Sequence, residues 1–248
     1  MLPVLELGPL VIPLPGILWL LGLWLGLSLS ERYSDRFGIS KVYLYNLVFI
    51  SLIAGLIGAR LSYVLRYPNE FFTSPFSLIS PNPDLLDPWG GVLAALAAGL
   101  IYGQRKHLPL WGTLDALVPL LAVLAVASGL SHLASGAAFG LPTRLPWGIE
   151  IWGARRHPSQ IYETLAATTI LIILWPRRPL IRPKESGIYF LSFVALSAGA
   201  RLLMEAFRGD SELLAGGFRL AQVLAWLILA LTFWGIARRR AQPPDPIG

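Results

Sequence analysis

The 248-residue sequence contains no cysteine, three histidines and only 14% charged residues. Without cysteine, the chain forms no disulfide, supplies no thiolate nucleophile and builds no thiolate metal site. The histidines, His107, His132 and His157, are scattered along the chain, so they make a poor metal cluster. We therefore expect neither a metal ion nor another cofactor.

Long apolar runs dominate the rest of the sequence. The chain is 55% hydrophobic, its mean hydropathy is +0.62, and its apolar runs are long enough to cross a bilayer as helices. Because backbone polar groups must be satisfied inside a membrane, we predict an all-α polytopic membrane protein. About seven transmembrane helices are expected, at roughly residues 10–30, 43–66, 89–104, 111–130, 159–176, 187–207 and 218–237.

The connections between these spans are short, which predicts one integral membrane domain over residues 1–248 with a small head region around 131–158. No basic region precedes the first apolar run and no small-residue cleavage site follows it. We therefore expect that run to be a retained span and not a signal peptide. Most basic residues behind the net charge of +6 lie in the connections between the predicted spans, so the charge indicates topology and not a nucleic-acid partner.

Lysine and arginine are divided unevenly between the two sides of the predicted membrane. Twelve lie after the first, third and fifth spans or in the C-terminal tail: Arg32, Arg36, Lys41, Arg105, Lys106, Arg177, Arg178, Arg182, Lys184, Arg238, Arg239 and Arg240. Six lie on the opposite side: Arg66, Arg144, Arg155, Arg156, Arg208 and Arg219. Because cytoplasmic loops are enriched in these residues, we predict an outer N-terminus, a cytoplasmic C-terminus and an outward-facing head region.

The segment 140–163 is the most polar part of the chain and leads directly into an apolar run. Pro158 is expected to be the first residue of the following helix, where a missing N–H costs nothing. The unpaired N–H groups and positive dipole end of a helix attract anions, which indicates a binding site there. The residues placed at this end are His157, Ser159, Gln160, Tyr162 and Glu163. The alternative is an ordinary capped helix entry.

Ionisable residues inside the predicted spans point to a charged cavity near the outer side. Arg201, Glu205 and Arg208 are spaced at i, i+4 and i+7, so they share one helix face. Arg60 lies within the second span and Glu163 lies one turn into the fifth. Charge inside a membrane is costly and is usually functional. The alternative is a structural network in which the carboxylates neutralise the arginines.

The sequence also resembles a known family over nearly its full length. The matching residues, in order, are Gly58-Ala-Arg-Leu61, Gly90-Gly91, Gly140-x-Pro-Thr143, Leu145-Pro-Trp-Gly148, His157-Pro-Ser-Gln160, Tyr162-Glu163, Arg201, Glu205, Arg208 and Gln222. Their order and spacing are similar to those of the bacterial prolipoprotein diacylglyceryl transferases. The resemblance implies an enzyme of the bacterial plasma membrane that moves a diacylglyceryl group from phosphatidylglycerol to the signal-peptide cysteine of a lipoprotein precursor. A chain without cysteine fits that chemistry, because the thiol arrives on the substrate.

Several polar positions of the family pattern are replaced in this chain. The family's His-Gly-Gly reads Trp89-Gly-Gly, and its early Tyr-Gly reads Pro15-Gly. Its Arg-x-Gly-Asn-x-x-Asn-Gly-Glu run becomes Gly129-Leu-Ser-His-Leu-Ala-Ser-Gly-Ala137, which removes an arginine, two asparagines and a glutamate. Two possibilities follow. Either other residues perform the reaction, or the protein is an impaired or re-purposed homologue that binds anionic phospholipid without the transfer. A small transporter is a weaker third interpretation, because no inverted repeat is visible.

The residues present suggest a division of roles. Arg201 and Arg60 are expected to hold the lipid phosphate, since guanidinium groups remain charged and offer a planar fork of donors. His132 is the preferred general base and His157 the alternative. The predicted catalytic set is Arg201, Glu205, His132 and His157. The predicted substrate-binding set is Arg60, Gly90, Gly91, Gly140, Ser159, Gln160, Tyr162, Glu163 and Arg208. A capping role is expected for Asp115.

Overall fold

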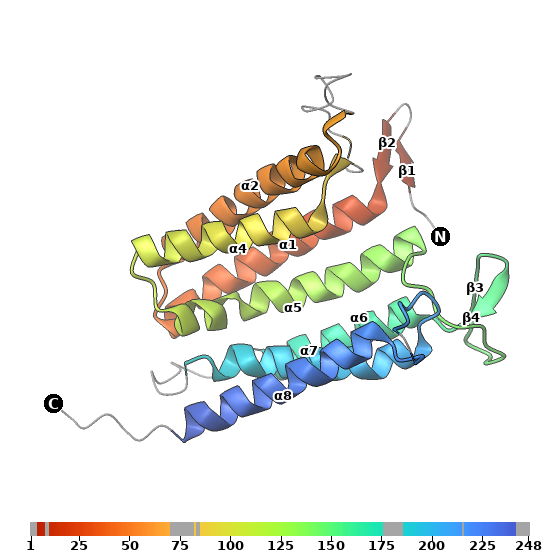
Figure 1. Ribbon diagram of the computed structural model, residues 1–248. Helices are drawn as coiled ribbons and strands as arrows, with labels where there is room; N and C mark the ends of the chain where they lie inside the picture. Colours follow the sequence, from red (N-terminus) through yellow and green to blue (C-terminus); the bar gives the residue numbers. More distant parts are fainter. Residues whose placement is uncertain are drawn as a thin grey trace. The chain divides into compact units, whose positions relative to one another are not determined.

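Seven α-helices make up most of the part of the chain that the computed structural model describes, which is residues 4–7, 10–69, 82, 85–175, 186–214 and 216–241. They are α1 (Leu14–Tyr33), α2 (Lys41–Arg66), α4 (Pro88–Arg105), α5 (Leu110–Ser135), α6 (Ser159–Ile173), α7 (Ile188–Met204) and α8 (Leu220–Arg240) (Figure 1). Each coincides with one predicted span. Short 3₁₀ turns, η1 (Ser34–Phe37) and η5 (Glu205–Phe207), extend α1 and α7.

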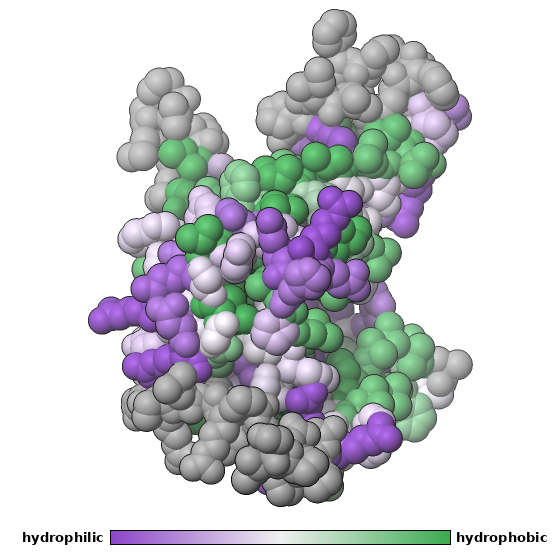
Figure 2. Space-filling view, turned by 90° about the vertical axis from the view of Figure 1, so that its left-hand side faces the viewer, coloured by the Kyte–Doolittle hydropathy of each residue, from purple (hydrophilic) through white to green (hydrophobic). Residues whose placement is uncertain are grey.

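Five of these helices are long and apolar enough to cross a membrane: Leu14–Phe37, Lys41–Arg66, Leu110–Ser135, Ile188–Phe207 and Leu220–Arg240. The 18-residue α4 and the 15-residue α6 do not belong to this set. Exposed hydrophobic residues run along the helix flanks, as in Leu20, Leu65 and Leu231. Figure 2, an end-on view, shows hydrophilic residues gathered at helix ends with hydrophobic ones beside them. The polytopic all-α class is confirmed, and the count of seven spans stays a prediction.

Two short antiparallel hairpins interrupt the helical pattern, and the sequence did not predict either of them. β1 (Val4–Leu7) pairs with β2 (Leu10–Pro13), so the first helix begins at Leu14 and not at residue 10. β3 (Ile149–Ile151) pairs with β4 (Ala154–Arg156) in the head region. Trp152 and Gly153 form its turn with φ of 52° and 72°, the left-handed pair that a tight hairpin requires.

The chain forms two compact units, residues 38–113 and residues 1–37 with 114–248. The first unit is the helical pair α2 and α4. Its two helices approach closely at glycine, since a Cβ on Gly91 would lie 3.0 Å from the Cβ of Ala59. Asp87 caps α4 by accepting from the Trp89 backbone N–H, and the Ser62 hydroxyl also donates to it at 2.6 Å. That hydroxyl holds the pKa of Asp87 below its ordinary value.

The second unit contains α1, most of α5, and α6 to α8. Pro119 interrupts α5, and the N–H of the next residue, Leu120, donates to the Ser30 hydroxyl of α1 at 2.9 Å. Ser30 is fully buried, and its hydroxyl accepts from the Leu120 N–H, a backbone donor beside the proline that needs a partner away from water. Asp115 caps α7 by accepting from the N–H groups of Gly187 and Phe190. The predicted capping role of Asp115 is confirmed, although the helix it caps is distant in sequence.

Candidate active site

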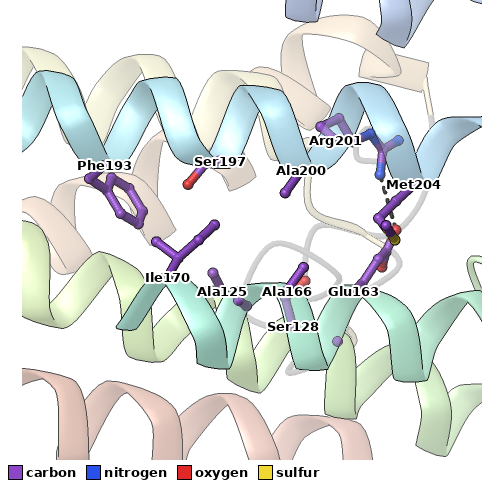
Figure 3. Close-up of a pocket in the computed structure, with 12 residues that line it drawn as sticks. Ala125, Ser128, Glu163, Ala166, Ile170, Phe193, Ser197, Ala200, Arg201 and Met204 are labelled. Carbon is purple, nitrogen blue, oxygen red and sulfur yellow. Dashed lines mark hydrogen bonds and ion pairs between the residues drawn. The ribbon is translucent and has the colours of Figure 1, made fainter. Parts of the chain in front are cut away.

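Four of the five ionisable residues of the predicted cluster, Arg201, Glu205, Arg208 and Glu163, lie together in the second unit, with Glu163 at the centre, whereas Arg60 belongs to the first unit. One Glu163 oxygen, Oε1, accepts from Arg201 at 3.2 Å and from Arg208 at 2.8 Å. The other, Oε2, lies 3.3 Å from Nδ1 of His132. The Glu163 carboxylate of α6 therefore joins His132 of α5, Arg201 of α7 and Arg208, and the Arg201–Glu163 contact is visible in Figure 3.

Glu205 adds a second carboxylate that is almost completely inaccessible, with 1% of its side chain exposed. Its Oε2 lies 3.0 Å from Arg201 and 3.9 Å from Arg208, as the i, i+4 and i+7 spacing predicted. Among the described residues no N–H points directly at this oxygen, so its contact with Arg201 is an ion pair without a hydrogen bond. The two arginines thus neutralise one buried and one partly buried acid, and a charge out of reach of water needs such partners.

The two arginines differ in how available they are to a ligand. Arg208 is 11% exposed and makes a two-pronged pair with Asp210, with both distances 2.9 Å. Burial alone lowers the pKa of Arg208, but Asp210 and Glu163 outweigh it and the pKa is raised. The side chain of Arg201 is 41% exposed. Arg201 is therefore the cation of this cluster that can also contact a bound anion.

Arg219, which sequence reasoning did not single out, holds the turn that carries Glu205 and Arg208. Its guanidinium donates to the backbone oxygens of both residues and to the Ser211 hydroxyl. A guanidinium with several fixed donors suits this purpose. In the sequence, Arg219, immediately before α8, stood out only as an arginine on the side of the predicted membrane that carries fewer basic residues.

Gly140 supports the same turn from the other side. It pairs with Arg208 in an isolated β-bridge, and Gly209 N–H donates to the Phe139 carbonyl at 2.9 Å. A Cβ on Gly140 would lie 2.7 Å from that of His157, so only glycine fits there. The geometry gives Gly140 a packing role, and its assignment to substrate binding stays a prediction.

The first side chains of α6 donate hydrogen bonds within the protein, so they are less available to an anion than those of an open site would be. Pro158 is the N-cap residue of α6, whereas the sequence predicted it to be the first helical residue. Ser159 and Gln160 are fully buried, and they donate to the carbonyls of Ala138 and Ala137 at 2.6 and 2.8 Å. These contacts support the capped-entry alternative for the two residues. Tyr162 is different, because its hydroxyl accepts from the Trp147 indole at 2.8 Å.

The two candidate bases occupy different surroundings. His132 is 35% exposed on its side chain, and only its Nδ1 has a hydrogen-bond partner within the described part of the chain. His157 packs against Tyr162 and Phe207, with ring centroids 6.3 and 5.3 Å away, and its Nδ1 is buried without a partner there. His132 is thus the histidine with a free nitrogen beside the charged cluster.

Two of the head-region arginines donate hydrogen bonds to backbone carbonyls within the protein. Arg155 donates to the carbonyls of Pro146 and Gly148, and Arg156 to those of Ile151 and Gly140. One of these bonds lies within the β3–β4 hairpin, and the other three tie the hairpin to the segment before it. Among the described residues, no group of three or more histidine, aspartate or glutamate side chains is placed to hold a metal ion.

Arg60, Gly90 and Gly91 belong to the first unit. Arg60 donates to the Leu85 carbonyl at 2.9 Å and so ties α2 to the segment before α4. A Cβ on Gly90 would overlap that of Ser62 and lie 2.5 Å from its hydroxyl oxygen. The structure therefore gives both glycines a reason in helix packing, while substrate binding by these three residues stays a prediction.

Replacing Gly90 by alanine should destabilise the protein by about 1–3 kcal/mol, because the new methyl group overpacks the α2–α4 contact. Gly103 of the same helix has no atom within 4 Å of its hypothetical Cβ. Gly103→Ala should therefore be neutral or stabilising by up to about 1 kcal/mol. Thermal unfolding in detergent measures both. Equal stability of the two variants would show that Gly90 is not needed for packing.

Comparison with known proteins agrees with these observations. The model of the family described as "Prolipoprotein diacylglyceryl transferase" matches residues 3–238. The chain belongs to the prolipoprotein diacylglyceryl transferase family. It is similar to proteins named phosphatidylglycerol–prolipoprotein diacylglyceryl transferase. The one from a Nostoc species is 30% identical, over 96% of this chain and 90% of that protein. The one from Bordetella bronchiseptica is 27% identical, over 97% and 95%.

The structure explains why one polar position of the diacylglyceryl transferase pattern is glycine here. A Cβ on Gly129 would overlap the Thr164 hydroxyl and lie 3.0 Å from the Thr164 backbone nitrogen. Helices α5 and α6 therefore meet too closely at this point for an arginine. His132 projects from the next turn of α5 and reaches the carboxylate of α6 instead.

Proposed function

We propose that this protein transfers a diacylglyceryl group from phosphatidylglycerol to the cysteine thiol of a lipoprotein precursor. The single observation that carries the proposal is the geometry at Glu163. One carboxylate holds an exposed guanidinium, Arg201, on one oxygen and an imidazole, His132, on the other. An anion-binding group and a proton acceptor are thereby fixed side by side, as the chemistry requires.

In this reaction the cysteine sulfur forms a bond to the glycerol carbon of the diacylglyceryl group, and the carbon–oxygen bond to phosphate breaks. The phosphate leaves with the second glycerol and carries the negative charge. Arg201 is placed to stabilise that charge, because a fixed guanidinium in a water-poor site acts strongly on developing charge. The thiol proton must go to a base before or during attack. His132 accepts it at Nε2.

Glu163 is a positioning residue in this scheme. By accepting from Nδ1–H of His132 it selects the tautomer in which Nε2 is free, and it orients the ring. By accepting from Arg201 and Arg208 it also fixes the distance between the base and the phosphate-binding cation. Glu205 and Arg219 support the same arrangement from the end of α7.

We further propose that the head region and this cluster lie on the outer face, with the C-terminus in the cytoplasm. Support comes from the described basic residues in the last turns of α1 and α8, Arg32 and Arg238–Arg240. Arg177, Arg178, Arg182 and Lys184 lie outside the described residues. A Trp147→Cys variant should be labelled by a membrane-impermeant thiol reagent from outside intact cells. Labelling only from the cytoplasmic side would contradict this orientation.

The function is tested by complementation. Bacteria depleted of their own transferase should again convert lipoprotein precursors to the lipid-modified form when this chain is expressed. The converted fraction is measured by metabolic labelling with a fatty acid. An Arg201→Ala variant present in the membrane at equal abundance should not restore the modification. Persistence of unmodified precursor with the wild-type chain would favour the lipid-binding homologue instead.

A further inference from the structure

Asp210 holds one guanidinium of the charged cluster in a two-pronged contact. Its Oδ1 accepts from Nε of Arg208 and its Oδ2 accepts from Nη2, both at 2.9 Å. The Asp210 side chain is 27% exposed, so it lies between the buried Arg208 and the outside of the cluster. Two parallel N–H···O bonds are also the arrangement in which a guanidinium holds a phosphate. Asp210 therefore occupies the edge of Arg208 that a bound phosphate would use.

The remaining nitrogen of the Arg208 guanidinium is also engaged. Its Nη1 donates to Oε1 of Glu163 at 2.8 Å, and the same oxygen accepts from Nη1 of Arg201 at 3.2 Å. The two guanidinium groups are therefore neighbours, because both reach one oxygen atom. Each nitrogen of the Arg208 guanidinium already has a carboxylate partner in the described part of the chain. A ligand that needs both cations must displace Asp210.

Arg201 is the accessible cation of the two. It lines the pocket shown in Figure 3, and its side chain is more exposed than that of Arg208. Arg219 is turned toward the chain, since its Nη1 donates to two backbone carbonyls of the turn at the end of α7. An anion therefore meets one accessible guanidinium. A second negative charge would have no cation of its own and would approach the Asp210 carboxylate, and like charges repel.

We propose that Asp210 is a specificity-determining residue that restricts the site to a phosphodiester with a single negative charge. By occupying Arg208, it withholds the second cation from a phosphomonoester, which carries a charge of about −1.5 to −2 at neutral pH. Selection against a wrong ligand by an unpaired or repelled charge is a general device of specific sites. The proposal deepens the proposed function and rests on it for the placement of a lipid phosphate at Arg201.

The test compares binding of phosphatidylglycerol, a phosphodiester, with binding of phosphatidate, a phosphomonoester with the same acyl chains. Both are measured without acceptor peptide, in one detergent, at about pH 8, which lies above a second phosphate pKa of ~6. The wild type should bind phosphatidylglycerol at least as tightly as phosphatidate. In Asp210→Asn the ratio of the two dissociation constants should move toward phosphatidate by at least about tenfold, because Arg208 then offers a charge-assisted pair.

Two further variants separate this effect from a change in net charge or in folding. Glu212→Gln is the matched control, because it removes an exposed acid two residues further along and keeps the Glu212 carbonyl that accepts from Leu220. It should keep the wild-type ratio. The double variant Arg208→Gln/Asp210→Asn lacks the cation that Asp210 occupies, so the gain for phosphatidate should disappear. A purely structural role of Asp210 would not make its effect depend on Arg208 in this way.

The outcomes separate the selection of charge from the reaction. A ratio in Asp210→Asn equal to that of the wild type would overturn the proposal, even if transfer is intact. An equal shift in Glu212→Gln would also overturn it, because net charge alone would then explain the result. If Asp210→Asn does not fold, the wild type decides, since tighter binding of phosphatidate than of phosphatidylglycerol would contradict the proposal. The predicted shift in a protein that catalyses no transfer would uphold the role of Asp210 and reject the proposed enzyme.

Discussion

Replacing Arg201 by alanine should lower the rate of diacylglyceryl transfer by about 10²–10³-fold. Removing one preorganised donor to a developing negative charge has an effect of this size in other enzymes. Arg201 is the exposed cation of the cluster, and the Asp210 pair holds Arg208 away from that task. Phosphatidylglycerol should also stabilise the wild-type protein by ~2.7 kcal/mol at a hundredfold excess over the dissociation constant, and the variant much less.

Stability must be separated from catalysis in this experiment. Arg201→Ala leaves Glu205 buried beside one remaining arginine, and breaking a buried pair costs about 3–5 kcal/mol. Arg201→Lys keeps the positive charge but loses the planar fork, so it should fold and still lose most of the rate. Arg144→Ala removes an exposed head-region charge and should stay within about twofold of the wild type. Wild-type transfer rates in Arg201→Lys and Arg201→Ala would contradict the role of Arg201.

Replacing His132 by asparagine should lower transfer by at least about a hundredfold and leave lipid binding unchanged. General-base assistance contributes about 10²–10⁴ in rate. Asparagine can still donate to Glu163, so the variant preserves the contact at Oε2 while removing the proton acceptor. The test is the rate of transfer to a cysteine peptide, measured for the wild type and for His132→Asn over a range of pH.

A structural role for His132 would give a different result. Because His132→Asn lacks the proton acceptor, it should lose the pH dependence of the wild-type transfer rate. His157→Asn should keep it, because His157 packs among aromatic rings and does not contact Glu163 in the described structure. Equal pH profiles for wild type and His132→Asn would show that another group accepts the thiol proton.

The sequence predicted the helices and the charged cluster for the same physical reason. An apolar run of about 20 residues in a membrane has no better way to satisfy its backbone than a helix. The spacing of Arg201, Glu205 and Arg208 places them on one face whatever the rest of the fold is. The expectation that buried charges find partners predicted the pairing of Arg201 with Glu163 and Glu205, but not the contact between His132 and Glu163.

Other features depend on contacts between distant segments and could not be predicted. The sequence could not show that Arg208 is held by Asp210 while Arg201 stays accessible, because that difference arises from contacts and packing in the folded protein. The glycines at 90 and 129 are explained by side chains of neighbouring helices, Ser62 and Thr164. The two hairpins were missed because strands of three or four residues give almost no periodic signal.

The most direct test of the whole account is the mass of a single-cysteine acceptor peptide after incubation with the purified wild-type protein and phosphatidylglycerol. The account predicts a mass gain equal to one diacylglyceryl group on the cysteine, and no gain on a peptide with serine at that position. No gain on the cysteine peptide would contradict the account, if a family member with the complete polar residue pattern modifies the same peptide under those conditions.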